Sequence, residues 1–154
     1  MNLIDIIRYF EEKFSKELAY EWDNVGIQVG TLNQRAKKIL ISLDLTKEVV
    51  KEAIDLKVDM IFTHHPLMFN PMHKIIFDSP RGWIIKNLIK HNITVYSAHT
   101  NYDVAQGGMN DVLASKLNIS KPILLDQNDE IGRYGKIEPI SFNDFVLQVK
   151  QTFN

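Results

Sequence analysis

The sequence predicts an α/β fold built on a largely parallel sheet with helices on both faces. Apolar runs of strand length alternate along the chain with segments whose apolar residues recur at helical spacing. This order of strand, helix, strand, helix, strand and helix favours parallel strands joined by right-handed crossovers. The chain has 154 residues, of which 45% are apolar, so it is long enough for one domain with its own core.

The predicted elements follow from local signals. Apolar residues at helical spacing over residues 3–14 indicate a first helix, and the segment 19–30, AYEWDNVGIQVG, is expected to be a loop. Thr46 is placed to cap a second helix, and Ser79 followed by Pro80 is typical of the start of a third. Strands are expected within KKILISLDL, VDMIF and ITVYSAH, which begin at residues 37, 58 and 93, and a further helix is expected at about 110–117.

Composition and charge narrow the classes of function. The 18 basic residues against 19 acidic ones leave a net charge of −1, so nothing indicates a general attraction to nucleic acid or to an anionic membrane. The N-terminal segment alternates charged and apolar side chains without the apolar core of a signal peptide or a spanning helix, and the cytoplasm is the expected location. The chain has no cysteine, so any metal must be held by nitrogen and oxygen ligands.

Polar residues gather where each of the three predicted strands ends. Open α/β sheets bind ligands beyond the carboxyl ends of their strands, so these side chains are expected at one edge. Each has an ordinary explanation by itself, since an aspartate there could cap a helix and a single histidine is commonly a packed or surface residue. Together they predict a metal site. The residues are Asp44 after the first strand, His64 and His65 after the second, and His99 with Asp103 after the third.

The adjacent histidines suggest how many ions such a site would hold. Neighbouring side chains of an extended segment point to opposite sides, and Pro66 favours an extended conformation for His65. One ion would be hard for both rings to reach, which favours two ions, with Asp103 bridging them or completing one of them. The alternative is that one histidine binds metal and the other supports it. His73, in an irregular loop, and His91, at a helix end, are left out of the site.

Five segments carry a resemblance to a known family. They are EWDNVGIQVG, SLDLTKEVVKEAI, THHPLMF, VYSAHTNYD and GGMNDVLASKLNI. In order and spacing they resemble the N-terminal motifs of the type 2 GTP cyclohydrolase I homologues, also called the Nif-three-like family, over residues 3 to about 138. The resemblance implies two related α/β lobes with a dinuclear metal centre between them, commonly assembled as ring-shaped homohexamers.

The resemblance also implies a set of site residues. Carried over by matching motif, the family's metal ligands from this part of the chain fall on His64, His65 and Asp103. His99 lies in the same motif as Asp103 and is expected near the metals, and whether His99 or Asp44 contacts them is left open. A further motif lines the same cleft, has an expected structural role, and matches Trp22, Asp23, Asn24 and Gly26.

The chain differs from the family at its C-terminal end. Family members carry a second half whose histidine and glutamate complete both metal spheres, whereas this sequence ends in SFNDFVLQVKQTFN. Ser141 and Asp144 are placed to begin a helix there. We therefore expect an α/β metal-binding lobe over residues 1–138 and, over residues 139–154, the start of a helix that leads to a missing C-terminal half. Metal occupancy of this portion alone is expected to be partial or absent.

Two classes of function fit such a site. The first is a metal-dependent hydrolase with GTP cyclohydrolase-like chemistry, or one that cleaves nucleotides or phosphoesters, in which two ions of Zn, Mn, Fe or Co activate water and polarise the bond under attack. Gly107 and Gly108 precede a helix whose N-terminus is a possible phosphate site. The second is a metal-stabilised oligomeric binding or adaptor protein without catalytic activity. The expected partners are further copies of the chain and a nucleotide or other phosphorylated small molecule.

Overall fold

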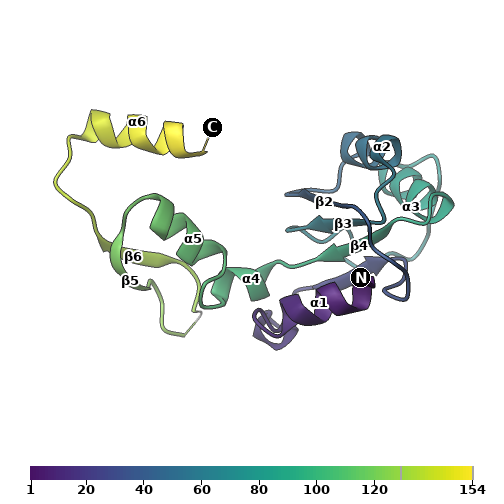
Figure 1. Ribbon diagram of the computed structural model, residues 1–154, viewed down its shortest axis with the longest axis horizontal. Helices are drawn as coiled ribbons and strands as arrows, with labels where there is room; N and C mark the ends of the chain where they lie inside the picture. Colours follow the sequence, from purple (N-terminus) through teal and green to yellow (C-terminus); the bar gives the residue numbers. More distant parts are fainter. Residues whose placement is uncertain (129, 154) are drawn as a thin grey trace. The chain divides into compact units, whose positions relative to one another are not determined.

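The chain folds into two compact units. The structure, a computed structural model, describes residues 1–128 and 130–153. The units are Met1–Asn101 and Tyr102–Asn154, called here the N-terminal unit and the C-terminal unit (Figure 1). No helix within the described residues is both long enough and apolar enough to cross a membrane.

The N-terminal unit is built on a four-stranded, mostly parallel sheet. β2, β3 and β4 run parallel to one another, which confirms the predicted α/β class and its largely parallel sheet. β1 pairs with β4 in the antiparallel direction. The strands lie in the order β1-β4-β3-β2 and comprise β1 (Gly26–Val29), β2 (Ile39–Ser42), β3 (Met60–Thr63) and β4 (Thr94–Ser97).

β1 lies within the segment 19–30, so the prediction of a loop is wrong for its residues. The local pattern misleads because polar Gln28 is buried and apolar Ile27 is 47% exposed, the reverse of a typical half-buried strand. Contacts with β4 stabilise β1 instead. Gly30, with φ +94°, approaches β4 so closely that a Cβ atom there would lie 2.9 Å from the Cα atom of Thr94.

Helices cover both faces of this sheet, as predicted. α2 (Lys47–Leu56) and α3 (Pro80–Lys90) lie together on one face (Figure 1). Their apolar residues form one buried cluster with Ile61 of β3 and Val95 of β4. This cluster is the main hydrophobic core of the N-terminal unit. It fixes the sheet from one side.

The opposite face of the sheet packs against α1 (Leu3–Glu11), which is followed by the short 3₁₀ helix η1 (Lys16–Leu18). Phe62 and Tyr96 follow Ile61 and Val95 in β3 and β4, so they point to this other face. Their rings stack with centroids 5.4 Å apart, and Phe10 meets both of them. The Tyr96 hydroxyl donates a hydrogen bond of 2.6 Å to Glu11, and burial together with this contact raises the pKa of Tyr96.

The predicted helix caps are confirmed. The hydroxyl of Thr46 accepts a hydrogen bond of 3.2 Å from the Val49 N–H at the start of α2. The hydroxyl of Ser79 accepts one of 3.1 Å from the Gly82 N–H, with Pro80 as the first residue of α3. These caps fix the residue at which each crossover helix begins.

The C-terminal unit is a small α/β arrangement around an antiparallel pair of strands. The predicted last helix is present, and the Ser141 hydroxyl accepts a hydrogen bond of 3.2 Å from the Asp144 N–H at its start. The proposed lobe boundary at residue 138 stays a prediction. The elements are α4 (Thr100–Val104), which begins in the N-terminal unit, α5 (Met109–Lys116), β5 (Ser120–Leu124), β6 (Arg133–Lys136) and α6 (Phe142–Phe153).

Candidate metal centre

The histidines of interest lie where two central strands of the sheet end. β3 ends at Thr63, directly before His64 and His65, and β4 ends at Ser97, shortly before His99. Thr63 and Ser97 are register partners, and their hydroxyls share a buried hydrogen bond of 2.7 Å. The two parallel strands therefore end level with each other, which brings the residues that follow them to one place.

His64, His65 and His99 form one compact group. Their ring centroids lie 5.0 Å (His64 to His65), 5.1 Å (His64 to His99) and 5.4 Å (His65 to His99) apart. One nitrogen from each ring lies within 4.8 Å of the nitrogens offered by the other two. Two nitrogens bound to one tetrahedral zinc ion are about 3.4 Å apart. Small side-chain movements would therefore bring all three rings onto a single ion.

Each of the three rings uses its Nδ1 atom for a hydrogen bond to an oxygen that can only accept. Nδ1 therefore carries the proton in the neutral rings. In that tautomer Nε2 carries the lone pair with which a histidine binds a metal ion. The distances from Nδ1 are 2.9 Å from His64 to the Ala98 carbonyl, 2.7 Å from His65 to the Asp44 carboxylate and 3.0 Å from His99 to the Asp23 carboxylate.

Asp23 orients His99 from a fully buried position. Its side chain is 0% exposed and accepts hydrogen bonds from His99, from the hydroxyl and backbone N–H of Thr100, and from the backbone N–H of Asn24. Burial alone would raise the pKa of Asp23, but these hydrogen bonds, led by those of the Thr100 hydroxyl and His99, outweigh it and lower the pKa. Asp23 is therefore an ionised acceptor at neutral pH.

Asp44 supports His65 in a more open setting. The side chains of His65 and Asp44 are 46% and 57% exposed, respectively. Asp44 contacts the Nδ1 atom of His65 and is not part of the candidate ligand group. Its role is to orient the His65 ring. The side of the histidine group at His65 is therefore accessible to solvent, while the His99 ring is mostly buried.

Buried Gln28 ties two site-bearing loops together. Its Oε1 atom accepts a hydrogen bond of 3.1 Å from the Met68 N–H, and its Nε2 atom donates one of 2.7 Å to the Asn24 carbonyl. The Asn24 side chain donates a further hydrogen bond of 2.6 Å to the Met68 carbonyl. The segment after β3 and the segment before β1 are thus held as one rigid rim. This network gives Asn24 a structural role.

The extended backbone expected around His65 is not observed. The chain bends at His64 and His65, and their backbone N–H groups donate to the carbonyls of Ser42 and Leu43, at 3.2 and 3.0 Å. Because of this bend, the two rings lie 5.0 Å apart and do not point to opposite sides. The argument for two ions from opposed rings is therefore wrong in its geometry, and a dinuclear site rests on the family resemblance alone.

The remaining candidates are not members of the compact group. Asp103 lies in α4, four residues after His99, and is not a member of the compact group, so its role as a ligand stays a prediction. His73 is exposed in an irregular stretch. His91 caps the C-terminal end of α3, where its Nδ1 atom lies 2.9 Å from the Asn87 carbonyl.

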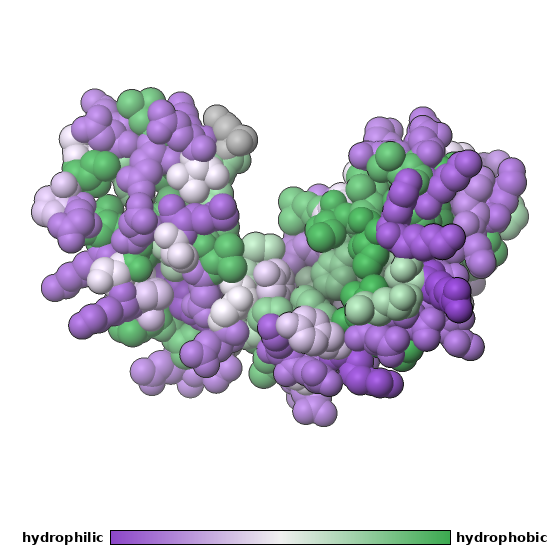
Figure 2. All heavy atoms as spheres, viewed as in Figure 1, coloured by the Kyte–Doolittle hydropathy of each residue, from purple (hydrophilic) through white to green (hydrophobic). Residues whose placement is uncertain are grey.

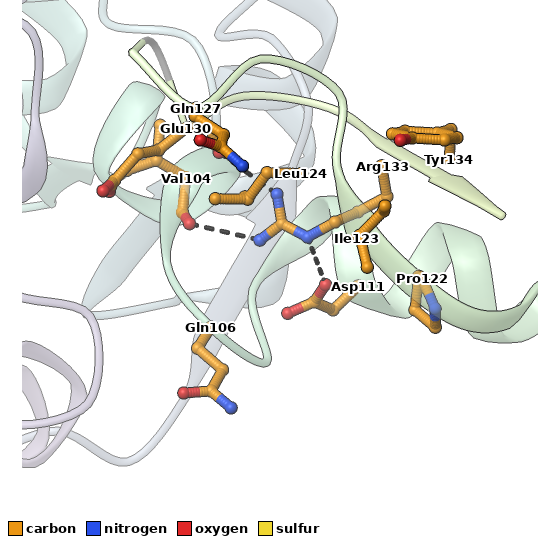
Figure 3. A pocket seen from close by; sticks show the side chains of 10 residues that line it. All are labelled: Val104, Gln106, Asp111, Pro122, Ile123, Leu124, Gln127, Glu130, Arg133 and Tyr134. Atoms are coloured by element: carbon orange, nitrogen blue, oxygen red, sulfur yellow. Dashed lines mark hydrogen bonds and ion pairs between the residues drawn. The ribbon is translucent and has the colours of Figure 1, made fainter.

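The C-terminal unit contains a pocket of about 730 Å³ (Figure 3). The guanidinium of Arg133 lies inside it and donates to the Asp111 carboxylate and to the Val104 carbonyl. Asp111 also accepts a hydrogen bond of 2.6 Å from the Gly107 N–H, before the start of α5. A carboxylate of the chain itself therefore takes an N–H group that the sequence suggested for a phosphate, which weakens that hypothesis.

The chemistry of the histidine group fits a divalent metal ion. Imidazoles whose Nδ1 atoms are held by hydrogen bonds are typical ligands of zinc and of similar first-row metals. Three protein ligands also leave a coordination position for water or substrate, as in catalytic sites. His64 and His99 are half-buried and His65 is exposed, so that position would be reachable from solvent.

The fold and the site together define an α/β protein with a histidine-based candidate metal centre. The chain matches the Duf34/NIF3 (NGG1p interacting factor 3) family over residues 1–154 and belongs to this family. The resemblance carried by the five sequence motifs is thereby confirmed.

Relatives and solved structures agree with this assignment. The chain is 45% identical over 125 residues to a Bacillus subtilis protein named GTP cyclohydrolase 1 type 2 homolog, covering 81% of this chain and 34% of the relative. A Methanocaldococcus jannaschii protein of the same name is 39% identical, with coverage of 98% and 61%. The chain thus spans between about a third and three fifths of the length of these relatives.

Two solved structures match the chain closely in fold. Reduced HcgD from Methanocaldococcus jannaschii has a TM-score of 0.89 at 38% identity, covering 98% of this chain and 60% of that one. The Bacillus cereus protein related to NIF3 has a TM-score of 0.78 at 47% identity, covering 82% and 35%.

Proposed function

We propose that the N-terminal unit binds a divalent metal ion, Zn, Mn, Fe or Co, through the Nε2 atoms of His64, His65 and His99. The observation that carries this proposal is the engagement of all three Nδ1 atoms with oxygen acceptors, which prepares the opposite nitrogens of a compact group. Asp103 is proposed as a further ligand, and a second ion with it, on the basis of the family motif.

The activity that we propose for this site in the family proteins is metal-dependent hydrolysis of a nucleotide or other phosphorylated small molecule. When bound, a divalent ion supplies Lewis-acid polarisation and a nucleophile at neutral pH. The residues of this chain contribute orientation: Asp23 fixes the ring of His99, and exposed His65 leaves the group open to an incoming molecule. The name GTP cyclohydrolase 1 type 2 homolog of the relatives supports hydrolysis as the reaction class.

A second candidate function is a metal-stabilised oligomeric binding or adaptor protein, and an apolar sheet edge favours it. β2 is an edge strand of the sheet, and Ile39, Ile41 and Leu43, in and just after it, are 37%, 78% and 58% exposed. Figure 2 shows apolar side chains at the surface of the N-terminal unit around β2. Such surface is typical of association, and the homohexamer implied by the resemblance would cover it.

Metal binding is tested by equilibrium dialysis of the chain against Zn²⁺, with the double variant His64→Ala, His65→Ala and with His91→Ala as a matched control. Occupancy of this portion of the protein is expected to be partial at most, so the comparison is relative: the control should bind as much zinc as the unaltered chain, and the double variant should bind less. Asp103→Asn should weaken binding by at least about tenfold if the carboxylate is a ligand. Full zinc retention by the double variant would contradict the proposed site.

Turnover separates the two candidate functions. A hydrolase, loaded with metal, converts members of a panel of nucleotides and phosphoesters, and His65→Ala abolishes this conversion. An adaptor shows no turnover, but its mass measured by light scattering falls when a chelator removes the metal. Metal binding with neither turnover nor a change of mass would contradict both functions while leaving the metal site intact.

A further inference from the structure

Two large aromatic side chains lie on the rim of the histidine group. Trp22 and Phe69 are 57% and 44% exposed, and their ring centroids lie 5.6 Å apart with an angle of 55° between the ring planes. Both rings meet the imidazole of His99, at 6.2 Å for Trp22 and 6.4 Å for Phe69. The candidate metal centre is therefore bordered on this side by an open pair of aromatic rings.

The aromatic pair is held in place by the network that orients the histidines. Trp22 lies in a turn closed by a hydrogen bond of 2.9 Å from the Asp23 N–H to the Tyr20 carbonyl, next to the buried anchor of Asp23. Phe69 directly follows Met68, whose backbone N–H and carbonyl are both bound by the Gln28 and Asn24 side chains. Ordered backbone on both sides lowers the entropy that these rings would lose on contact with a ligand.

Other exposed aromatic residues of the same unit have different surroundings. Tyr9 and Phe77 are 62% and 53% exposed, but a lysine ammonium lies over each ring, at 4.8 and 5.1 Å from the centroid. Trp22 and Phe69 instead share one edge with His99. Exposure beside the histidine group therefore distinguishes Trp22 and Phe69 from the other exposed aromatic residues of this unit.

We propose that Trp22 and Phe69 form a stacking subsite for a planar heteroaromatic ring in the small molecule that reaches the histidine group. One ring of the pair offers its face to the incoming ring, and the other, tilted by 55°, meets its edge. Stacking of this kind recognises any planar base without reading its hydrogen-bond pattern. The inference rests on the proposed function only in placing the reacting group of that molecule at the metal centre.

Ring binding is tested by fluorescence in the Trp83→Phe background, where Trp22 is the remaining tryptophan. Adenosine and ribose are the matched probes, because they differ only by the base, and a chelator keeps the protein free of metal. We expect saturable quenching of Trp22 by adenosine and none by ribose. Phe69→Leu should weaken adenosine binding by at least about fivefold, the lower range for loss of one stacked aromatic contact, and Phe77→Leu should leave it unchanged.

Three outcomes would overturn the subsite. The first is quenching that rises linearly with adenosine concentration, as it does for free tryptophan. The second is equal quenching by ribose. The third is an unchanged affinity for adenosine in Phe69→Leu. Because the protein is free of metal, saturable ring binding supports the subsite even if zinc dialysis fails. Zinc binding without ring binding removes the subsite alone.

Discussion

The two units of this protein are stabilised by different means. In the N-terminal unit, apolar residues of α2 and α3 pack with the sheet in one buried cluster, with further aromatic packing on the other face. In the C-terminal unit, the buried apolar residues are small, such as Val104 and Ala114, and Arg133 joins β6 to Asp111 of α5. The histidines follow strands of the apolar unit, so their positions depend on a tightly packed sheet.

The largest expected difference between the units concerns core truncation. Ile61 is 0% exposed in the N-terminal unit and Ile123 is 55% exposed in the C-terminal unit, so the two isoleucines form a matched pair. Ile61→Ala should lower the free energy of unfolding by about 2–5 kcal/mol, whereas Ile123→Ala should change it by less than about 0.5 kcal/mol. Urea unfolding followed by far-UV circular dichroism, to which both units contribute, measures both, because the two tryptophans, Trp22 and Trp83, lie in the N-terminal unit. Equal effects would contradict the contrast in burial between the two isoleucines.

The next largest effect concerns the buried acceptor behind His99. Asp23→Asn replaces a charged acceptor with an amide whose NH₂ group faces existing donors, so His99 loses its fixed orientation. We expect zinc affinity to fall by about 10- to 100-fold, the range for lost supports of metal ligands. Asp44→Asn is the matched control at an exposed carboxylate and should have a smaller effect. Isothermal titration with Zn²⁺ measures both affinities. Equal losses of zinc affinity in the two variants would contradict the larger role given to Asp23.

A smaller effect is expected from breaking the ion pair between Arg133 and Asp111 in the C-terminal unit. The Arg133 side chain is 6% exposed and that of Asp111 is 25% exposed, so the pair is partly screened by solvent. Arg133→Met should destabilise the unit by about 1–2 kcal/mol, because Asp111 and the Val104 carbonyl lose a donor. Hydrogen exchange of the α5 and β6 amides measures the change. Lys136→Met, on the same strand, should leave their exchange unaffected.

The smallest effect is the pH dependence of the stability that this ion pair gives to the C-terminal unit. Burial would raise the pKa of Asp111, but hydrogen bonds from Arg133 and the Gly107 N–H, with the charge of Arg133, lower it. A lowered folded-state pKa gives stability that is present above the unfolded pKa and is lost as pH falls through the folded pKa. After correction for the intrinsic slowing of amide exchange at lower pH, the protection of the α5 amides should therefore fall on acidification, and Asp111→Asn should flatten this profile. An unchanged slope in that variant would contradict the assignment.

The parts of the fold with strong local signals could be predicted from the sequence. Thr46, Ser79 and Pro80 mark the starts of α2 and α3, and the three parallel strands coincide with apolar runs. β1 could not be predicted in this way, because it buries polar Gln28, exposes apolar Ile27 and depends on pairing with β4, far away in the sequence.

The candidate site was predictable in its location but not in its geometry. The ends of β3 and β4 pointed to His64, His65 and His99, since parallel strands end at a common edge. The support of His99 by Asp23 could not be seen, because the two residues are 76 positions apart and meet only through the folded loop. The bend at His64 and His65 was also missed, because the proline rule describes a local preference that hydrogen bonds to β2 and the loop after it override.

Proton–nitrogen correlation NMR of the imidazole rings, with and without Zn²⁺, tests the central claim most directly. Without zinc, His64, His65 and His99 should each show the tautomer protonated at Nδ1, as their acceptors require. On addition of zinc, the Nε2 resonances of these three rings should shift together, while those of His73 and His91 stay unchanged. Protonation at Nε2 in the metal-free protein, or zinc shifts that appear in His73 and His91 instead, would contradict the account.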